Sequence, residues 1–141
     1  MENINSFKLE LDAKTVNVSF ARGVVAMFAS ELKPTLSEVN DLKTAVSEAV
    51  TNSIVHGYDG KSGKIILESK INGNKIDITV TDFGKGIDDI DMALQPFFTS
   101  KAEEEHSGMG FTLMDSFMSY LDVKPNPDGG LIVHMQKVIK G

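Results

Sequence analysis

Alternating apolar and polar residues open the chain and predict a β-strand. Phe7, Leu9 and Leu11 alternate with charged residues, which is the period of a strand with one buried face. Similar patterns predict further strands at residues 64–71, 75–81, 121–124 and 131–138. Between the second and third strands, Asn72-Gly73-Asn74 supplies residues that tolerate positive φ, so a tight hairpin is expected there.

Apolar residues at helical spacing predict three helices. They are expected at 16–32, from Thr35 or Ser37 to Gly57, and from Phe111 to Met118. Pro34 ends the first helix, because proline cannot continue a helix, and the hydroxyl of Thr35 or Ser37 caps the second. Residues 84–110 carry glycines and charges without a clear period, and such a long irregular stretch indicates a functional loop.

Hairpins and helices in one chain of 141 residues predict an α/β (α+β) fold. We expect a single domain over residues 1–141, built as a two-layer sandwich with helices on one face of a mixed, mainly antiparallel sheet. The net charge of −6 argues against direct nucleic-acid binding. No apolar run approaches the roughly 18 residues that cross a bilayer, so a cytoplasmic protein is expected. Cysteine is absent, which excludes disulfides and thiolate metal ligands.

A polar stripe runs along one border of the second helix. Glu48, Asn52 and His56 are four residues apart and therefore lie on one side of the helix. The apolar neighbours of this stripe are the small Ala45 and Ala49, which leave room for a ligand. An ordinary solvated helix edge would show the same spacing, so the stripe alone does not identify a site.

A second motif, Asp82-Phe83-Gly84-Lys85-Gly86, directly follows a predicted strand. Its carboxylate can accept an amino proton of adenine, and its glycines let the backbone approach a ligand closely. Asp-Phe-Gly also occurs in eukaryotic-type protein kinases, but the other kinase motifs are missing here. The third motif, Gly108-Met109-Gly110, precedes a predicted helix, whose N-terminal amides favour phosphate. Each motif alone also fits a simple turn.

The ordered set of an acid-to-amide helix, Asp-x-Gly-x-Gly after a strand and Gly-x-Gly before a helix resembles the three boxes of the GHKL ATPase and kinase superfamily, which has the Bergerat fold. The resemblance is closest to the anti-sigma F serine kinases. It rests on Val46-Ser47-Glu48-Ala49-Val50-Thr51-Asn52, His56-Gly57-Tyr58, Pro96-Phe97-Phe98-Thr99-Ser100-Lys101 and Ser107-Gly108-Met109-Gly110-Phe111.

This resemblance implies a set of site residues. Glu48 matches the general base, Asn52 the ligand of Mg²⁺, and Arg22 an arginine that contacts protein partners. Contacts with ATP are implied for Asn52, Asp82, Gly84, Gly86, Thr99, Ser100, Lys101, His106, Ser107, Gly108, Met109, Gly110 and Phe111. The chain departs from the family pattern at His106, where an arginine is usual, and at Leu131 and Ile132, where a threonine is usual.

The resemblance also implies an activity. Family members phosphorylate a serine of an anti-anti-sigma factor and, as ATP-bound homodimers, sequester the sporulation sigma factor F. Two other functions fit the same residues. One is a nucleotide-dependent module that sequesters the sigma factor without catalysis. The other is a detached ATPase domain of a histidine kinase, although 141 residues leave no dimerisation helix with a phosphoaccepting histidine.

Overall fold

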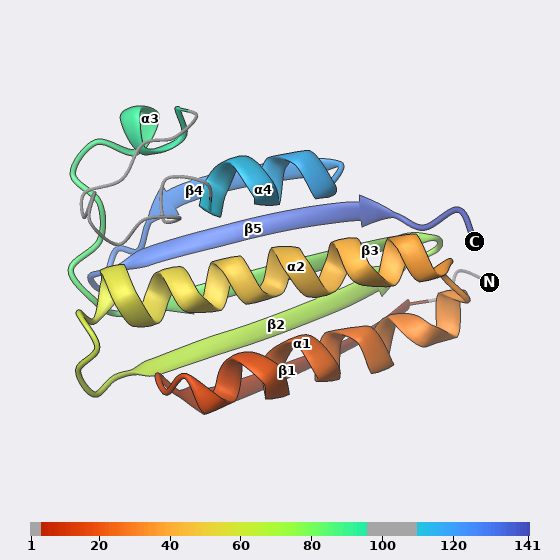
Figure 1. Cartoon of the computed structure of the whole chain (residues 1–141), viewed down its shortest axis with the longest axis horizontal. Coiled ribbons are helices and arrows are strands. Elements are labelled where there is room, and N and C mark those ends of the chain that lie inside the picture. The colour runs from red at the N-terminus through yellow and green to blue at the C-terminus, as the bar shows by residue number, and fades with distance from the viewer. Residues whose placement is uncertain (1–3, 96–109) are drawn as a thin grey trace.

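The computed structural model describes residues 4–95 and 110–141, and Figure 1 shows helices packed over one face of a sheet. The strands are β1 (Ile4–Asp12), β2 (Lys64–Asn72), β3 (Lys75–Asp82), β4 (Tyr120–Pro125) and β5 (Leu131–Val138). The helices are α1 (Val16–Ala29), α2 (Leu36–Asn52), α3 (Ile90–Ala93) and α4 (Gly110–Phe117). A 3₁₀ turn, η1 (Ser30–Leu32), extends α1, and a π-helical turn, η2 (Ser53–Gly57), extends α2.

The five strands form one sheet in the order β1-β2-β3-β5-β4. All four pairings are antiparallel, which confirms the expected two-layer fold and its mainly antiparallel sheet. The hairpin between β2 and β3 turns at Gly73, whose φ of 67° requires a residue that tolerates the left-handed region. In this order the end of β3 lies beside the start of β5, which brings residues about fifty positions apart together.

The second predicted helix is confirmed, and its first turn explains where it begins. Thr35 accepts a hydrogen bond from the backbone N–H of Glu38, whose side chain accepts one from the N–H of Thr35. This reciprocal capping box satisfies two amides that the helix itself leaves unpaired. The helix reaches Gly57 as expected, although its last turn has π geometry. Such turns often lie at functional sites.

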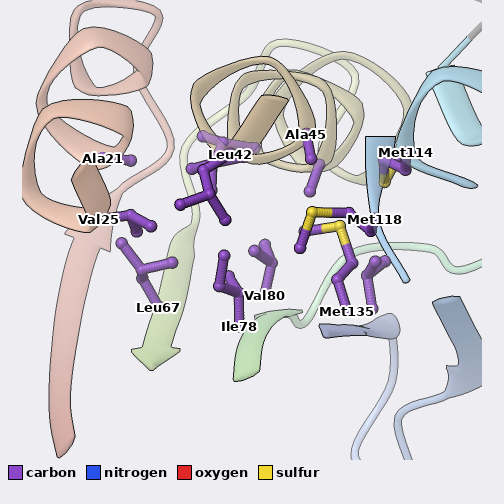
Figure 2. Packing of buried hydrophobic residues seen from close by; sticks show 14 of the residues in the cluster. Ala21, Val25, Leu42, Ala45, Leu67, Ile78, Val80, Met114, Met118 and Met135 are labelled. Carbon is purple, nitrogen blue, oxygen red and sulfur yellow. The ribbon is translucent and has the colours of Figure 1, made fainter. Parts of the chain in front are cut away.

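The core lies between the helices and the sheet. Figure 2 shows Leu42 and Ala45 of α2 above Ile78 and Val80 of β3, with three methionine side chains gathered beside α4. Residues 42, 45, 46, 49 and 50 of α2 are fully buried, because α2 packs between α1 and α4 over the middle of the sheet. A polar residue on the border of that buried face therefore belongs to a helix that is packed against another helix on both sides.

Helix α1 buries small residues and exposes large ones. Ala21 and Val25 are fully buried against the rest of the protein, whereas Val16, Phe20 and Met27 are 73%, 52% and 77% exposed. The helix was predicted correctly, but only some of its large apolar residues face the core, where Phe28 packs edge-on against Phe7. Small side chains on the buried face let the axis of α1 approach that of α2 closely.

Helix α3 lies within the stretch that the sequence predicted to be irregular. Its cap is Asp89, whose side chain accepts a hydrogen bond of 3.0 Å from the N–H of Met92. A helix of four residues is too short to produce a recognisable period. None of the helices within residues 4–95 and 110–141 is long and apolar enough to span a membrane.

Candidate functional site

The polar stripe on α2 lies where its spacing predicted. Glu48 and Asn52 belong to α2, His56 lies in the π-helical turn, and all three side chains are half-buried. Ala45 and Ala49 beside them are fully buried, so the stripe follows the edge of the core rather than the solvated side of the helix. No hydrogen bond to the side chain of Asn52 is found within the described residues, which leaves its amide oxygen open to a ligand.

Glu48 lies next to the start of α4. A Cβ atom built on Gly110, the first residue of that helix, would lie 3.6 Å from the Oε1 atom of Glu48. The backbone amides of a helix N-terminus attract negative charge, so the carboxylate and an anionic ligand at this end of α4 would be neighbours. The structure thus brings Glu48 of the first motif beside Gly110, the last residue of the third, although 62 residues separate them along the chain.

Asp82, the last residue of β3, lies beside the C-terminal end of α2 and is only 2% exposed. Its Oδ2 atom accepts a hydrogen bond of 2.8 Å from the hydroxyl of Ser53, in the π-helical turn after Asn52. Its Oδ1 atom accepts from the N–H groups of Gly84 at 3.1 Å and Leu131 at 3.2 Å. A carboxylate offers about four acceptor positions, so these three donors orient the group and leave one position open.

The backbone packs closely around Asp82, and this requires glycine. A Cβ atom on Gly84 would clash with the carbonyl oxygen of Gly57, and one on Gly130 with the backbone oxygen of Asp82. Gly130 also has a φ of 99°, which side chains rarely allow. The second glycine of the motif, Gly86, is half-buried with its α-carbon facing Gly130. The end of α2, the loop after β3 and the start of β5 therefore meet without intervening side chains.

Three polar residues of this region could not be assigned from the sequence. Ser53, which is 2% exposed, contacts a carboxylate 29 positions away in the chain. Asn126 is 8% exposed and donates a 2.9 Å hydrogen bond to the backbone oxygen of Asp82. The hydroxyl of Tyr58 donates to the carbonyl of Lys64 and accepts a 2.8 Å hydrogen bond from the N–H of Phe83. The one signal in the sequence was the set of turn-forming residues around Asn126. Such residues do not indicate which group the side chain of Asn126 contacts.

A hollow of about 420 Å³ lies between α1 and α2. It is lined by Arg22, Asn40, Lys43, Thr44, Ser47 and Glu48. Glu48 therefore belongs both to this hollow and to the surroundings of Gly110. Arg22, which the family resemblance pointed to, lies on the wall contributed by α1.

Comparisons with known proteins show the family of the chain. The model of the histidine kinase-like ATPase domain family matches residues 11–137. Proteins called anti-sigma F factor are similar over nearly the whole chain. The one from Thermoanaerobacter sp. (strain X514) is 54% identical over 139 residues, which cover 99% of this chain and 97% of the relative. The chain belongs to the anti-sigma F factor family.

Two further members of the anti-sigma F factor family show the same extent of similarity. The protein from Caldanaerobacter subterraneus subsp. tengcongensis is 52% identical, with 99% of this chain and 97% of the relative covered. That from Clostridium kluyveri (strain ATCC 8527 / DSM 555 / NBRC 12016 / NCIMB 10680 / K1) is 53% identical, with 95% and 94% covered. Within this family, the histidine kinase-like ATPase domain implies that the chain binds a nucleotide.

Part of the expected nucleotide site of this anti-sigma F family member lies outside the described residues. These are Thr99, Ser100, Lys101, His106, Ser107, Gly108 and Met109. Of the third motif, Gly110 is buried and Phe111 is half-buried against the core. Leu131, at a departure from the family pattern, buries its side chain and contacts Asp82 through its backbone N–H. That contact does not depend on the identity of the side chain.

Proposed function

We propose that this chain is an ATP-dependent serine kinase and anti-sigma factor. In this proposal it binds and inhibits the sporulation sigma factor F, and it phosphorylates and inactivates the anti-anti-sigma factor. The observation that carries the kinase function is the order of groups along one helix. Glu48, Asn52 and the Ser53–Asp82 pair follow one another from the hollow to the end of β3. The names of the relatives, anti-sigma F factor, support the sigma factor as a partner.

Asp82 is the proposed acceptor for the amino group of adenine. Its open acceptor position fits one N–H donor, and Ser53, Gly84 and Leu131 hold the carboxylate so that it need not reorient on binding. The close backbone packing at Gly84 and Gly130 leaves this side free of side chains that would cover a flat base. A guanine would place a carbonyl oxygen against the carboxylate, so the site should select ATP over GTP.

Asn52 is the proposed protein ligand of Mg²⁺. Within the described residues, no group of three His, Asp or Glu side chains is arranged to hold a metal. This fits Mg²⁺ bound with a nucleotide, because such ions take one or two protein ligands, with phosphate oxygens and waters as the others. The bound ion would neutralise charge on the transferring phosphoryl group. Gly110 and the helix dipole of α4 would face the phosphates, and residues 99–101 and 106–109, outside the described part of the chain, are proposed to contact ATP.

Glu48 is the proposed general base. Its carboxylate accepts the proton of the serine Oγ as that oxygen forms a bond to the γ-phosphorus. The bond from the γ-phosphorus to the bridging oxygen breaks, and its electron pair leaves with ADP. A positioned base contributes roughly 10²- to 10⁴-fold in rate, and positioning and electrostatics supply most of the remainder. Arg22 is proposed to contact the protein partners, and the ATP-bound state is proposed to be a homodimer.

The test is phosphoryl transfer from labelled ATP to the purified anti-anti-sigma factor. Glu48→Gln should reduce label on the partner's serine at least 10²-fold while ATP affinity stays within about twofold. Glu68→Gln, which changes a carboxylate on the face of the sheet opposite the helices, is the matched control and should transfer at the wild-type rate. Full activity of Glu48→Gln would remove Glu48 from the mechanism. If the wild type binds ATP but transfers no label, the chain is a non-catalytic sequestering module instead.

A further inference from the structure

Tyr58 lies where the π-helical turn η2, the start of β2 and the end of β3 meet. Its backbone N–H donates a 3.0 Å hydrogen bond to the carbonyl of Ser53, which closes the π-helical turn. Its hydroxyl donates to the carbonyl of Lys64 and accepts a 2.8 Å hydrogen bond from the N–H of Phe83. Figure 1 shows the end of α2, the start of β2 and the end of β3 at one end of the molecule. One residue therefore connects the helical layer to two neighbouring strands.

The hydroxyl of Tyr58 continues the β-sheet beyond its last regular pair. The pairing of β2 with β3 ends at Ile65 and Asp82. One step further along both strands, the hydroxyl bridges the carbonyl of Lys64 and the N–H of Phe83. A bridging oxygen holds two backbones farther apart than a direct hydrogen bond between them does. The position of Tyr58 therefore sets how far the chain after Asp82 lies from β2.

The aromatic ring of Tyr58 is held in place by packing. A Cβ atom built on Gly63 would lie 2.4 Å from a carbon of the ring, so the ring lies directly against the backbone that leads into β2. The other side of the residue packs against the hydrophobic core. A ring packed in this way, with its hydroxyl bonded to two backbone groups, keeps one orientation. Tyr58 can therefore fix the position of the N–H of Phe83.

Both contacts of Tyr58 lead to Asp82. Ser53, whose carbonyl accepts from the N–H of Tyr58, donates its hydroxyl to the Oδ2 atom of Asp82 at 2.8 Å. Phe83, whose N–H donates to the hydroxyl of Tyr58, directly follows Asp82 in the chain. Tyr58 thus acts on the carboxylate from two directions, through a side-chain partner and through the backbone.

We propose that Tyr58 is a positioning residue that sets the affinity for ATP through Asp82, without contacting the nucleotide. This inference rests on the proposed function, in which Asp82 accepts the amino group of adenine. Without the hydroxyl, the N–H of Phe83 loses its acceptor and the chain after Asp82 shifts. Hydrogen bonds weaken steeply as their angle departs from linear, so a rotated carboxylate binds the amino group less well.

The test compares two nucleotides by isothermal titration calorimetry on the full chain with Mg²⁺. One is ATP, and the other is purine riboside triphosphate, which lacks the amino group of adenine. Tyr58→Phe removes only the hydroxyl. It should raise the Kd and KM of ATP about fivefold, which corresponds to one ordinary hydrogen bond. The kcat and the Kd of the analogue should stay within about twofold, because neither depends on the contact between Asp82 and the amino group.

Ser69→Ala is the matched control for the loss of a hydroxyl. Ser69 is 3% exposed, and its hydroxyl donates a 2.8 Å hydrogen bond to the carbonyl of Asp77 in the same β2–β3 hairpin. Both variants remove a hydroxyl that donates to a backbone carbonyl, so both should lower the urea midpoint by a similar amount. Only Tyr58→Phe should change the Kd of ATP.

Gly63→Ala provides a second variant, which keeps the hydroxyl but displaces the ring. The added methyl group would overlap the ring of Tyr58, so the Kd of ATP should again rise while that of the analogue does not. Gly23→Ala is its control, because no atom lies within 4 Å of a Cβ built on this residue of α1. This control should leave both Kd values unchanged.

The outcomes separate this inference from the proposed function. If the wild type prefers ATP to the analogue, an unchanged Kd of ATP in both variants would overturn the role of Tyr58 and leave that of Asp82 intact. Equal losses of affinity for the two nucleotides would do the same. Equal binding of both nucleotides by the wild type would remove Asp82 from base recognition, and this inference with it. The Kd values do not require phosphoryl transfer, so they decide the role of Tyr58 even if the kinase activity is absent.

Discussion

At the residue scale, the site depends on backbone atoms that touch because side chains are absent. Gly84 lies so close to the carbonyl of Gly57 that a Cβ atom there would overlap it. The N–H of Gly84 also donates to Asp82, and the next amide, of Lys85, donates a 2.9 Å hydrogen bond to the oxygen of Gly57. The loop after β3 is thereby attached to the end of α2, which fixes the direction of the Asp82 carboxylate.

Replacing Gly84 with alanine should therefore destabilise the protein. The added methyl group can be accommodated only by moving the backbone of Gly57, and such overpacking costs about 1–3 kcal/mol. ATP affinity should fall as well, because the shift would displace Asp82. Urea unfolding and nucleotide titration would measure the two effects.

Gly23→Ala is the matched control for this prediction. Gly23 lies within α1 with no atom within 4 Å of a built Cβ, so the same substitution should stabilise the protein by about 0.5–1 kcal/mol. Equal effects of the two substitutions on the urea midpoint would show that the close contact at Gly84 carries no energetic weight.

The sequence indicated the side chains of the proposed site better than the groups that hold them. Glu48 and Asn52 could be found from spacing on one helix, and Asp82 from its place after a strand. Ser53 and Asn126 could not, because their contacts with Asp82 join positions 29 and 44 residues apart. Such contacts follow from the strand order and the π-helical turn, which leave no local pattern in the sequence.

At the element scale, the start of α2 is tied to the end of the chain. Besides capping its own helix, Glu38 accepts hydrogen bonds from the N–H of Lys140 at 2.7 Å and of Gly141 at 3.1 Å. These amides, that of Lys140 first, and the N–H of Thr35 hold the pKa of Glu38 below its ordinary value. One carboxylate thus joins the beginning of a helix to the residues after β5.

Glu38→Ala should lower the free energy of unfolding near pH 7 by about 1 kcal/mol, and the loss should depend on pH. A carboxylate whose pKa is lower in the folded state stabilises the fold above its unfolded pKa, near 4.5. That contribution disappears as the pH falls through the lower, folded value. Urea unfolding at a series of pH values should therefore show wild type and variant converging below about pH 4.5.

Glu68→Ala serves as the control for the pH series, because Glu68 lies on the face of the sheet opposite the helices. The free energy of unfolding of Glu68→Ala should differ little from that of the wild type. This difference should not shrink at low pH as it does for Glu38→Ala. A constant gap between wild type and Glu38→Ala down to about pH 3 would contradict the assignment of the stabilisation to the ionised carboxylate.

Elements were predicted more reliably than the faces they bury. Strand and helix positions agree within a few residues, since the periods that indicate them are local. For α1 the buried face could not be inferred from apolar spacing, because Val16, Phe20 and Met27 are exposed whereas Ala21, Val25 and Ala29 are buried. Large apolar side chains that gather on an outer face are typical of a surface that binds another protein.

At the scale of the whole molecule, the proposed nucleotide site joins elements from most of the chain. Asn52 ends α2, Asp82 ends β3, Leu131 begins β5 and Gly110 begins α4. A ligand that contacts all four binds only when these elements are assembled. Nucleotide binding and folding are therefore coupled, and the stability of the protein should depend on the concentration and identity of the nucleotide.

ATP with Mg²⁺ at a hundredfold excess over its Kd should increase the free energy of unfolding by about 2.7 kcal/mol, and GTP should not. The difference is expected because the proposed partner of Asp82 is the amino group of adenine, whereas guanine presents an oxygen at that position. Asp82→Asn should abolish the ATP effect while keeping the fold, since the Ser53 hydroxyl can accept from the new amide. Glu48→Gln should retain the effect. Thermal denaturation with each nucleotide measures all four cases, and equal stabilisation by GTP would exclude Asp82 from base recognition.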